Sequence, residues 1–139
     1  MPNVYIDTNI VVDLCDEGRP MHIPSLTRID QYLDKGYDLY INSDSMATLF
    51  YILTSRAKLS TNAALEKLEF VQGIFDLSVI TPAEISEAIA ISKSQTTPHT
   101  DYEDALQYIC AQKIDAEAII TNDRRFVSSD IPVISSEDN

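Results

Sequence analysis

The sequence predicts an α/β protein, a three-layer α/β/α sandwich around a central, mostly parallel sheet of four or five strands. Short apolar runs rich in β-branched residues recur along the chain, which is typical of buried strands. Segments with apolar residues at helical spacing lie between them, and such segments are the usual crossovers between parallel strands. The 139 residues suit one domain with a proper core and are too few for two ordinary ones, so we expect residues 1–139 to form a single domain.

Five short strands are expected, because five segments are apolar, β-prone and bounded by polar or turn residues. In chain order they are residues 4–6, 37–41, 77–80, 118–121 and 131–134. A further apolar run at residues 10–15 follows the first strand and is closed by a loop at residues 16–20.

Five helices are expected from apolar residues at helical spacing and from residues that start or stop helices. They begin near Pro24, Asn42, Ser60, Pro82 and Asp101. Ser25 is a candidate N-cap of the first helix, and Gly36 is its expected C-terminal stop. The polar residues 94–100 separate the last two helices. Strands and helices therefore alternate, which places helices on both faces of the sheet.

The composition describes a soluble globular protein, with 45% hydrophobic and 23% charged residues. No apolar run approaches the ~20 residues needed to span a bilayer, and the first residues do not form a signal peptide. We therefore expect a cytoplasmic protein without a membrane segment. Cys15 and Cys110 each lie in a helix-like apolar pattern, and we expect two buried thiols rather than a disulfide.

The net charge of −12 limits the partners of the chain. It argues against broad electrostatic adhesion to nucleic acid, which needs lysine and arginine side chains against phosphates. A nucleic-acid enzyme with its acids gathered in a metal site is still compatible with this charge. The charge also favours a basic protein partner.

Aspartates follow two of the expected strands and open one of the expected helices. Asp7 follows the first strand and Asp123 the fourth, and the carboxyl ends of these strands share one edge of a parallel sheet. Asp101 and Asp104 lie at i and i+3 in a first helical turn, so both carboxylates project from one face. The alternative for Asp101 and Asp104 is ordinary helix capping, worth roughly 0.5–2 kcal/mol, and Asp7 could likewise be only a helix cap.

The conjunction of these acids predicts a cation site. Carboxylates ~4 Å apart repel by about 4 kcal/mol per pair at an effective dielectric constant of 20, so several converge only around a cation. Oxygen-rich, water-accessible clusters suit Mg²⁺ or Mn²⁺. Such ions activate a water molecule for attack on a phosphodiester and neutralise the charge that develops on the phosphate.

Two other α/β folds that handle phosphate fit less well. A phosphatase of the haloacid-dehalogenase type would carry Asp-x-Asp after the first strand, whereas this chain has Asp7-Thr8-Asn9. A P-loop nucleotidase would need Gly-x-x-x-x-Gly-Lys-Ser/Thr, and none of the three glycines is so placed.

Three segments, taken in order, resemble the PIN domain family. They are Asp-Thr-Asn at residues 7–9, Asp-Tyr-Glu-Asp-Ala-Leu at residues 101–106 and Ile-Ile-Thr-Asn-Asp-Arg-Arg-Phe at residues 119–126. The closing strand at residues 131–134 also fits, so the resemblance covers essentially the whole chain. It implies a Mg²⁺- or Mn²⁺-dependent endoribonuclease acting on RNA. Small bacterial members are commonly VapC-like toxins, which implies a type II toxin, a homodimer and a cognate antitoxin partner.

The same resemblance implies roles for individual residues. Asp7, Asp104 and Asp123 take the metal-binding acidic positions, and Asp101 resembles an accessory acid of some branches. Asn9 and Thr121 resemble groups that support the acids or orient the substrate.

One departure from the family pattern concerns Thr48. The family usually carries a glutamate there, and a threonine supplies neither a negative charge nor a base. An alternative function is therefore a degenerate PIN domain that binds RNA or protein without cleaving. Asp44 lies one helical turn earlier and either leans into the same pocket or caps its helix.

Three arginines and one histidine near the acids can each be interpreted as functional or as ordinary surface residues. Arg124, like its neighbour Arg125, either contacts RNA phosphate at the mouth of the site or forms a surface ion pair. Arg56 has the same two interpretations with less positional support. His99 is expected to be a solvated loop residue rather than a catalytic one.

Overall fold

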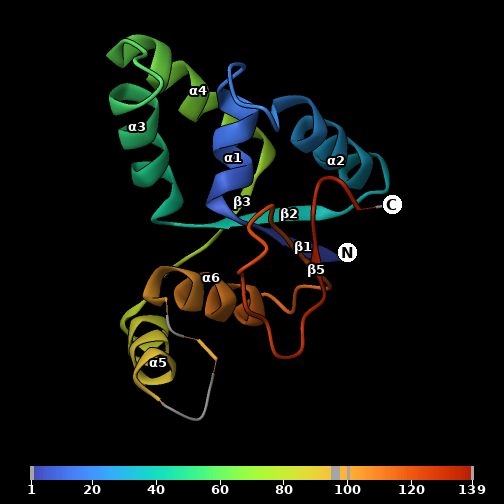
Figure 1. Cartoon of the computed structure of the whole chain (residues 1–139), viewed down its shortest axis with the longest axis vertical. Helices are drawn as coiled ribbons and strands as arrows, with labels where there is room; N and C mark the ends of the chain where they lie inside the picture. Colours follow the sequence, from blue (N-terminus) through green and yellow to red (C-terminus); the bar gives the residue numbers. More distant parts are fainter. Residues whose placement is uncertain (1, 95–97, 100, 139) are drawn as a thin grey trace.

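The computed structural model describes residues 2–94, 98, 99 and 101–138 (Figure 1). These residues form a five-stranded sheet with the strand order β3-β2-β1-β4-β5. All four strand pairings are parallel, which confirms the expected sheet. The strands are β1 (Asn3–Ile6), β2 (Asp38–Asn42), β3 (Asp76–Ser78), β4 (Ile119–Ile120) and β5 (Val133–Ile134).

Helices cover both faces of the sheet. Over the described ranges they are α1 (Thr8–Cys15), α2 (His22–Asp34), α3 (Ser45–Ser55), α4 (Thr61–Ile74), α5 (Pro82–Lys93) and α6 (Tyr102–Lys113). Figure 1 shows α1 to α4 on one side of the sheet and α5 and α6 on the other. The order of layers is therefore the expected α/β/α sandwich.

The side chains of β1 divide the core in two. Val4 and Ile6 pack into a cluster with the helices α1 to α4, whereas Tyr5 packs into a second cluster with α5 and α6. This alternation follows from the two-residue period of a strand, and both faces are apolar because both are covered by helices. Cys15 and Cys110 lie in these two clusters as buried free thiols, as expected.

The start of α2 differs from the prediction. The helix begins at His22, two residues before Pro24. It can include Pro24 because an N–H in the first turn has no helical partner, so the N–H that proline lacks is not missed there. Ser25 is therefore not the N-cap; its buried hydroxyl donates to Asp13 Oδ2 at 2.9 Å. Gly36 ends the helix as predicted, with a φ of 82° that favours glycine.

Backbone pairing continues beyond the central strands into the loops that follow. The amide of Asp7 donates to the carbonyl of Ile120 at 2.9 Å, and the amide of Thr121 donates to the carbonyl of Ile134 at 3.0 Å. Asp7 and Thr121 are thereby held side by side at the carboxyl edge of the sheet. Across the described ranges, no helix has the length and apolarity that a membrane crossing requires.

Candidate active site

A cavity of about 360 Å³ opens where β1 and β4 end, and we refer to it as the acid cavity. The four predicted aspartates, Asp7, Asp101, Asp104 and Asp123, all line it. The other lining residues come from the starts of α1 and α6 and from one side of α3: Thr8, Asn9, Thr48, Tyr51, Ile52, Arg56, Glu103 and Gln107. The structure therefore brings together acids that are up to 116 positions apart in the sequence.

Asp7 is the buried centre of the cavity, with 2% of its surface exposed. Its Oδ2 accepts a hydrogen bond from the hydroxyl of Thr121 at 2.5 Å, and its Oδ1 accepts from the side-chain amide of Gln107 at 2.9 Å. Burial raises the pKa of Asp7, and the hydrogen bonds from Thr121 and Gln107 oppose that rise. Because a carboxylate oxygen can accept two hydrogen bonds, Oδ2 retains capacity for a ligand.

Gln107 was not among the residues predicted from the sequence. Its Oε1 accepts hydrogen bonds from the Tyr5 hydroxyl and the Thr8 amide, each at 3.2 Å, while its nitrogen donates to Asp7. Gln107 lies three positions after Asp104 and hence on the same helical face. That spacing was the signal that could have identified it.

Asp101 and Asp104 act together at the start of α6. Asp101 is the N-cap, and its Oδ1 accepts from the backbone amide of Asp104 at 3.0 Å. The pKa of Asp104 rises from 3.8 to about 6 because the side chain is partly buried and because Asp7, Asp101 and Asp123 carry like charge. An aspartate can therefore cap a helix and also line the acid cavity: Asp101 does both at α6, and Asp7 does both at α1.

Thr121 links the aspartate after β1 to the aspartate after β4. Its hydroxyl donates to Asp7 and accepts from the backbone amide of Asp123 at 3.0 Å. Asp123 also pairs with Arg125, whose Nε lies 3.3 Å from Oδ1, but the arginine side chain is 92% exposed. An exposed pair of this kind contributes at most about 1 kcal/mol.

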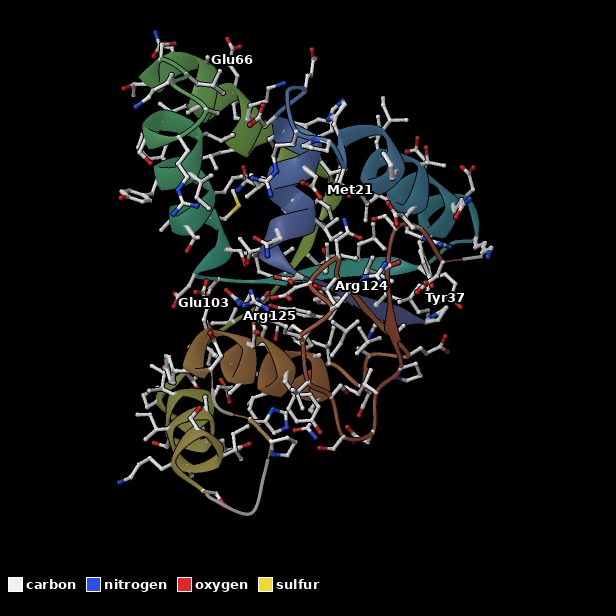
Figure 2. All side chains as sticks on the ribbon, in the orientation of Figure 1. Met21, Tyr37, Glu66, Glu103, Arg124 and Arg125 are labelled. Atoms are coloured by element: carbon white, nitrogen blue, oxygen red, sulfur yellow. The ribbon has the colours of Figure 1, made fainter. Side chains whose placement is uncertain are left out.

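Arg124 does not line the acid cavity. It lines two other cavities, beside residues such as Asn122 and Ser135. Its side chain is labelled in Figure 2. Among the side chains that line the acid cavity, Arg56 at the end of α3 is the basic one. Arg56 reaches this cavity because α3 packs beside the site, whereas Arg124 shares a neighbouring cavity with Thr121 and Asp123.

Three residues lie around the position where the family usually carries a glutamate. Thr48 lines the acid cavity as expected, and Glu103 lines the same cavity although the sequence did not single it out. Asp44 lines a neighbouring cavity instead and forms no side-chain hydrogen bond as a cap.

His99 is buried, so the expectation of a solvated loop histidine was wrong. Its exposed fraction is 5%, and its ring stacks on Tyr108 with the centroids 4.7 Å apart. Burial lowers the pKa of His99, which favours the neutral ring. The contact attaches the segment before α6 to that helix.

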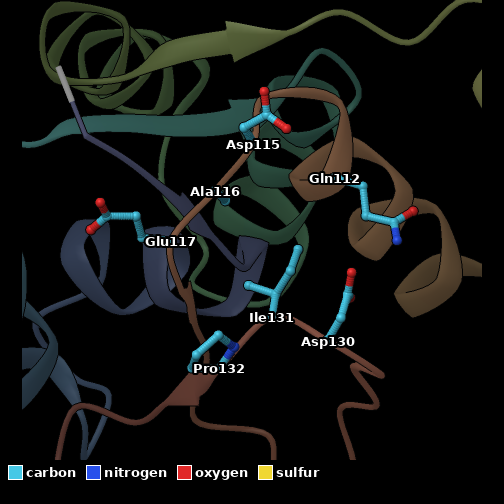
Figure 3. A pocket seen from close by; sticks show the side chains of 7 residues that line it. All are labelled: Gln112, Asp115, Ala116, Glu117, Asp130, Ile131 and Pro132. Carbon is cyan, nitrogen blue, oxygen red and sulfur yellow. The ribbon is translucent and has the colours of Figure 1, made fainter.

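A larger cavity, of about 560 Å³, lies at the opposite edge of the sheet (Figure 3). Glu117 and Asp130 line it, but each is already engaged by a tyrosine: Tyr37 for Glu117, and Tyr108, at 2.6 Å, for Asp130. Open parallel sheets bind ligands at the carboxyl ends of their strands. The smaller acid cavity is therefore the candidate active site.

The donor chemistry of the acid cavity suits a hard divalent cation, because its lining is rich in carboxylate oxygens. Over the part of the chain that the structure describes, no three His, Cys, Asp or Glu side chains already form a group close enough to hold a metal. Carboxylates that share a site repel one another, and a bound cation would remove that repulsion.

A parallel α/β sheet with an aspartate-lined cavity at its carboxyl edge places this chain among α/β proteins with an acidic site. The chain belongs to the PIN domain family, whose model matches residues 4–131.

One relative supports that assignment by its sequence, and two solved structures share the fold. The protein named Ribonuclease VapC1 of Aquifex aeolicus (strain VF5) is 33% identical over 135 residues, which cover 97% of this chain and 91% of that protein. A chain of VapBC2 from Rickettsia felis, solved bound to a DNA fragment from their promoter, has a TM-score of 0.69 at 15% identity and coverage of 96% and 98%. VapC20 from Mycobacterium tuberculosis, described as a sarcin-ricin loop cleaving toxin, has a TM-score of 0.66 at 11% identity and coverage of 84% and 86%.

Proposed function

We propose that this protein is a Mg²⁺- or Mn²⁺-dependent endoribonuclease and the toxin of a type II toxin–antitoxin pair. One observation carries the proposal: four aspartates from three separate segments line one cavity at the carboxyl edge of the sheet. The family assignment and the relative named a ribonuclease, 33% identical, support RNA as the substrate.

Each aspartate has a distinct part in this proposal. Asp7, Asp104 and Asp123 would hold the cation, and Asp101 would assist from its cap position. The bound ion would supply an activated water molecule and neutralise charge on the phosphate. Thr121 keeps the Asp7 carboxylate oriented and joins it to the Asp123 backbone. Asn9 lines the cavity beside them and is suited to orient the substrate.

Arg56 is suited to hold an RNA phosphate in this acidic protein. The chain carries a net charge of −12, so RNA is repelled except where a positive side chain is placed locally. Arg56 lies on the wall of the acid cavity, eight residues after Thr48 on the same helix. At a rise of 1.5 Å per residue that separation is about 12 Å along α3, so Arg56 lies at the far end of this cavity wall from Thr48.

The test is cleavage of a mixed-sequence RNA with added Mg²⁺ or Mn²⁺. Asp7→Asn keeps the shape of the side chain and removes its charge, and it should lower the cleavage rate at least about 100-fold. Asp115→Asn is the matched control, because Asp115 lines the cavity at the opposite edge. Unchanged cleavage by folded Asp7→Asn would refute the assignment of the acids.

A homodimer and a cognate antitoxin complete the proposal. The strongly acidic chain favours a partner with basic segments, which would cover the acid cavity. Light scattering on the purified chain should give twice its mass of 15.6 kDa. A monomer at micromolar concentration would contradict the dimer but not the nuclease.

A second candidate function is a degenerate PIN domain that binds RNA or protein without cleavage. Thr48 favours it, since this side chain lines the acid cavity without contributing charge. Calorimetric titration with Mn²⁺ separates the two functions. Saturable binding that Asp104→Asn removes supports the nuclease, and no binding at millimolar Mn²⁺ supports the degenerate domain.

A further inference from the structure

A second cavity, of about 380 Å³, adjoins the acid cavity, and we refer to it as the side pocket. The two cavities share Thr8, Thr48, Glu103 and Gln107 in their linings. The side pocket extends from these residues towards the end of β2 and the first turns of α3 and α6. A group bound there would lie next to whatever the aspartates hold.

Two side-chain amides, which carry neutral hydrogen-bond donors, line the side pocket. The side-chain nitrogen of Asn42 donates to the Tyr5 hydroxyl at 2.9 Å, and that of Gln107 donates to Asp7 at 2.9 Å. Each amide nitrogen has two N–H groups, and these contacts use one of them. Both residues are buried, so their donors are held in place by the surrounding polar network.

Phosphate is a poor occupant of the side pocket. The helix α3 begins beside it, and helix N-termini usually attract anions through their free amides. Here the amides of Asp44 and Ser45 both donate to Asn42 Oδ1 at 2.9 Å. The carboxylates of Asp44 and Glu103 also line the pocket and repel negative charge.

One wall of the side pocket is aromatic and apolar. Tyr102 and Leu106 lie one helical turn apart on α6, and both line the pocket. Tyr102 is 42% exposed, so a flat group can reach its ring. Unpaired bases of RNA stack on such rings, and their edges form hydrogen bonds with amides and carboxylates.

We propose that the side pocket binds one nucleobase of the RNA, next to the phosphate held at the aspartates; this rests on the proposed nuclease function. Tyr102 stacks on the base, and Asn42 and Gln107 donate to its acceptors. Asp44 and Glu103 accept from exocyclic amino groups, so adenine, cytosine and guanine bind more strongly than uracil. The cleavage site is thereby selected by the base in this pocket.

The first experiment measures binding without catalysis. Adenosine, cytidine, guanosine and uridine are titrated into the metal-free protein in EDTA, and the side-chain amide signals of Asn42 and Gln107 are followed by NMR. Saturable shifts with the amino-bearing nucleosides, weakened about 10-fold or more by Tyr102→Ala and retained by Tyr102→Phe, support the pocket. No shift with any nucleoside, or a shift with inorganic phosphate instead, overturns it.

The second experiment measures selection of the cleavage site. The wild-type protein cleaves a random RNA library, and sequencing should show an enriched base at one position beside the cut. Tyr102→Ala should remove that enrichment, whereas the control Phe70→Ala should keep it, because Phe70 is equally exposed at 46% but lies on α4. Cleavage with identical base preference in Tyr102→Ala overturns the pocket and leaves the nuclease standing. Nucleoside binding without any cleavage overturns the nuclease alone.

Discussion

Replacing Asp104 by asparagine should stabilise the metal-free protein. In the folded state, burial and the neighbouring acids Asp7, Asp101 and Asp123 raise the pKa of Asp104 from 3.8 to about 6. The unfolded chain keeps the ordinary pKa. The protonated carboxyl group is therefore favoured in the folded state, and its stabilising contribution to the free energy of unfolding is fully present below about pH 4. This contribution is lost as the pH rises through about 6 and the group becomes charged.

The size of the effect follows from that shift. A rise of about two pKa units corresponds to about 3 kcal/mol at 1.36 kcal/mol per unit. Asp104 is only partly buried, and solvent screening reduces the figure to about 1–2 kcal/mol. Asparagine removes the charge and keeps the hydrogen bond to Asp101, because that bond comes from the backbone amide of residue 104.

Urea unfolding in EDTA, followed by circular dichroism, measures the difference. At pH 8 Asp104→Asn should unfold with a free energy about 1–2 kcal/mol above that of the wild type, and at pH 4.5 the difference should shrink. Added Mn²⁺ should stabilise the wild type but not the variant. Asp115→Asn serves as the control at an acid outside the cavity. A folded Asp104→Asn variant that gains no stability at pH 8 would refute the repulsion among these acids.

Two further predictions concern the support of the site and the core. Thr121→Val removes the hydroxyl that donates to buried Asp7, so it should lower the free energy of unfolding by about 1–3 kcal/mol and the Mn²⁺ affinity about 10- to 100-fold. Thr121→Ser restores the donor and should recover most of both quantities in urea unfolding and calorimetry; no recovery would contradict the role of the hydroxyl. Leu53→Ala opens a cavity beneath α3 and should cost about 2–5 kcal/mol, because Leu53 is fully buried. Its Mn²⁺ affinity, measured by calorimetry on the folded variant, should stay within a few-fold of wild type, and a large loss would show that the core and the acids are coupled.

Local patterns were sufficient to predict the layers of the fold and the positions of the acids. Apolar runs marked the strands, and Pro82 and Gly36 marked the first residue and the end of two helices. Asp7 and Asp123 were recognisable because each comes shortly after a strand, and parallel strands present their carboxyl ends at a common edge. These inferences depend only on neighbouring residues and on general rules of chain connection.

Features that depend on contacts between distant segments required the tertiary structure. The strand order β3-β2-β1-β4-β5 places β4 beside β1, and Thr121 thereby reaches Asp7. Helix packing brings Arg56 rather than Arg124 to the acid cavity and buries His99 against Tyr108. Side-chain partners of this kind are set by how whole elements pack, whereas the residue pattern reports only the period of each element and which of its faces is apolar.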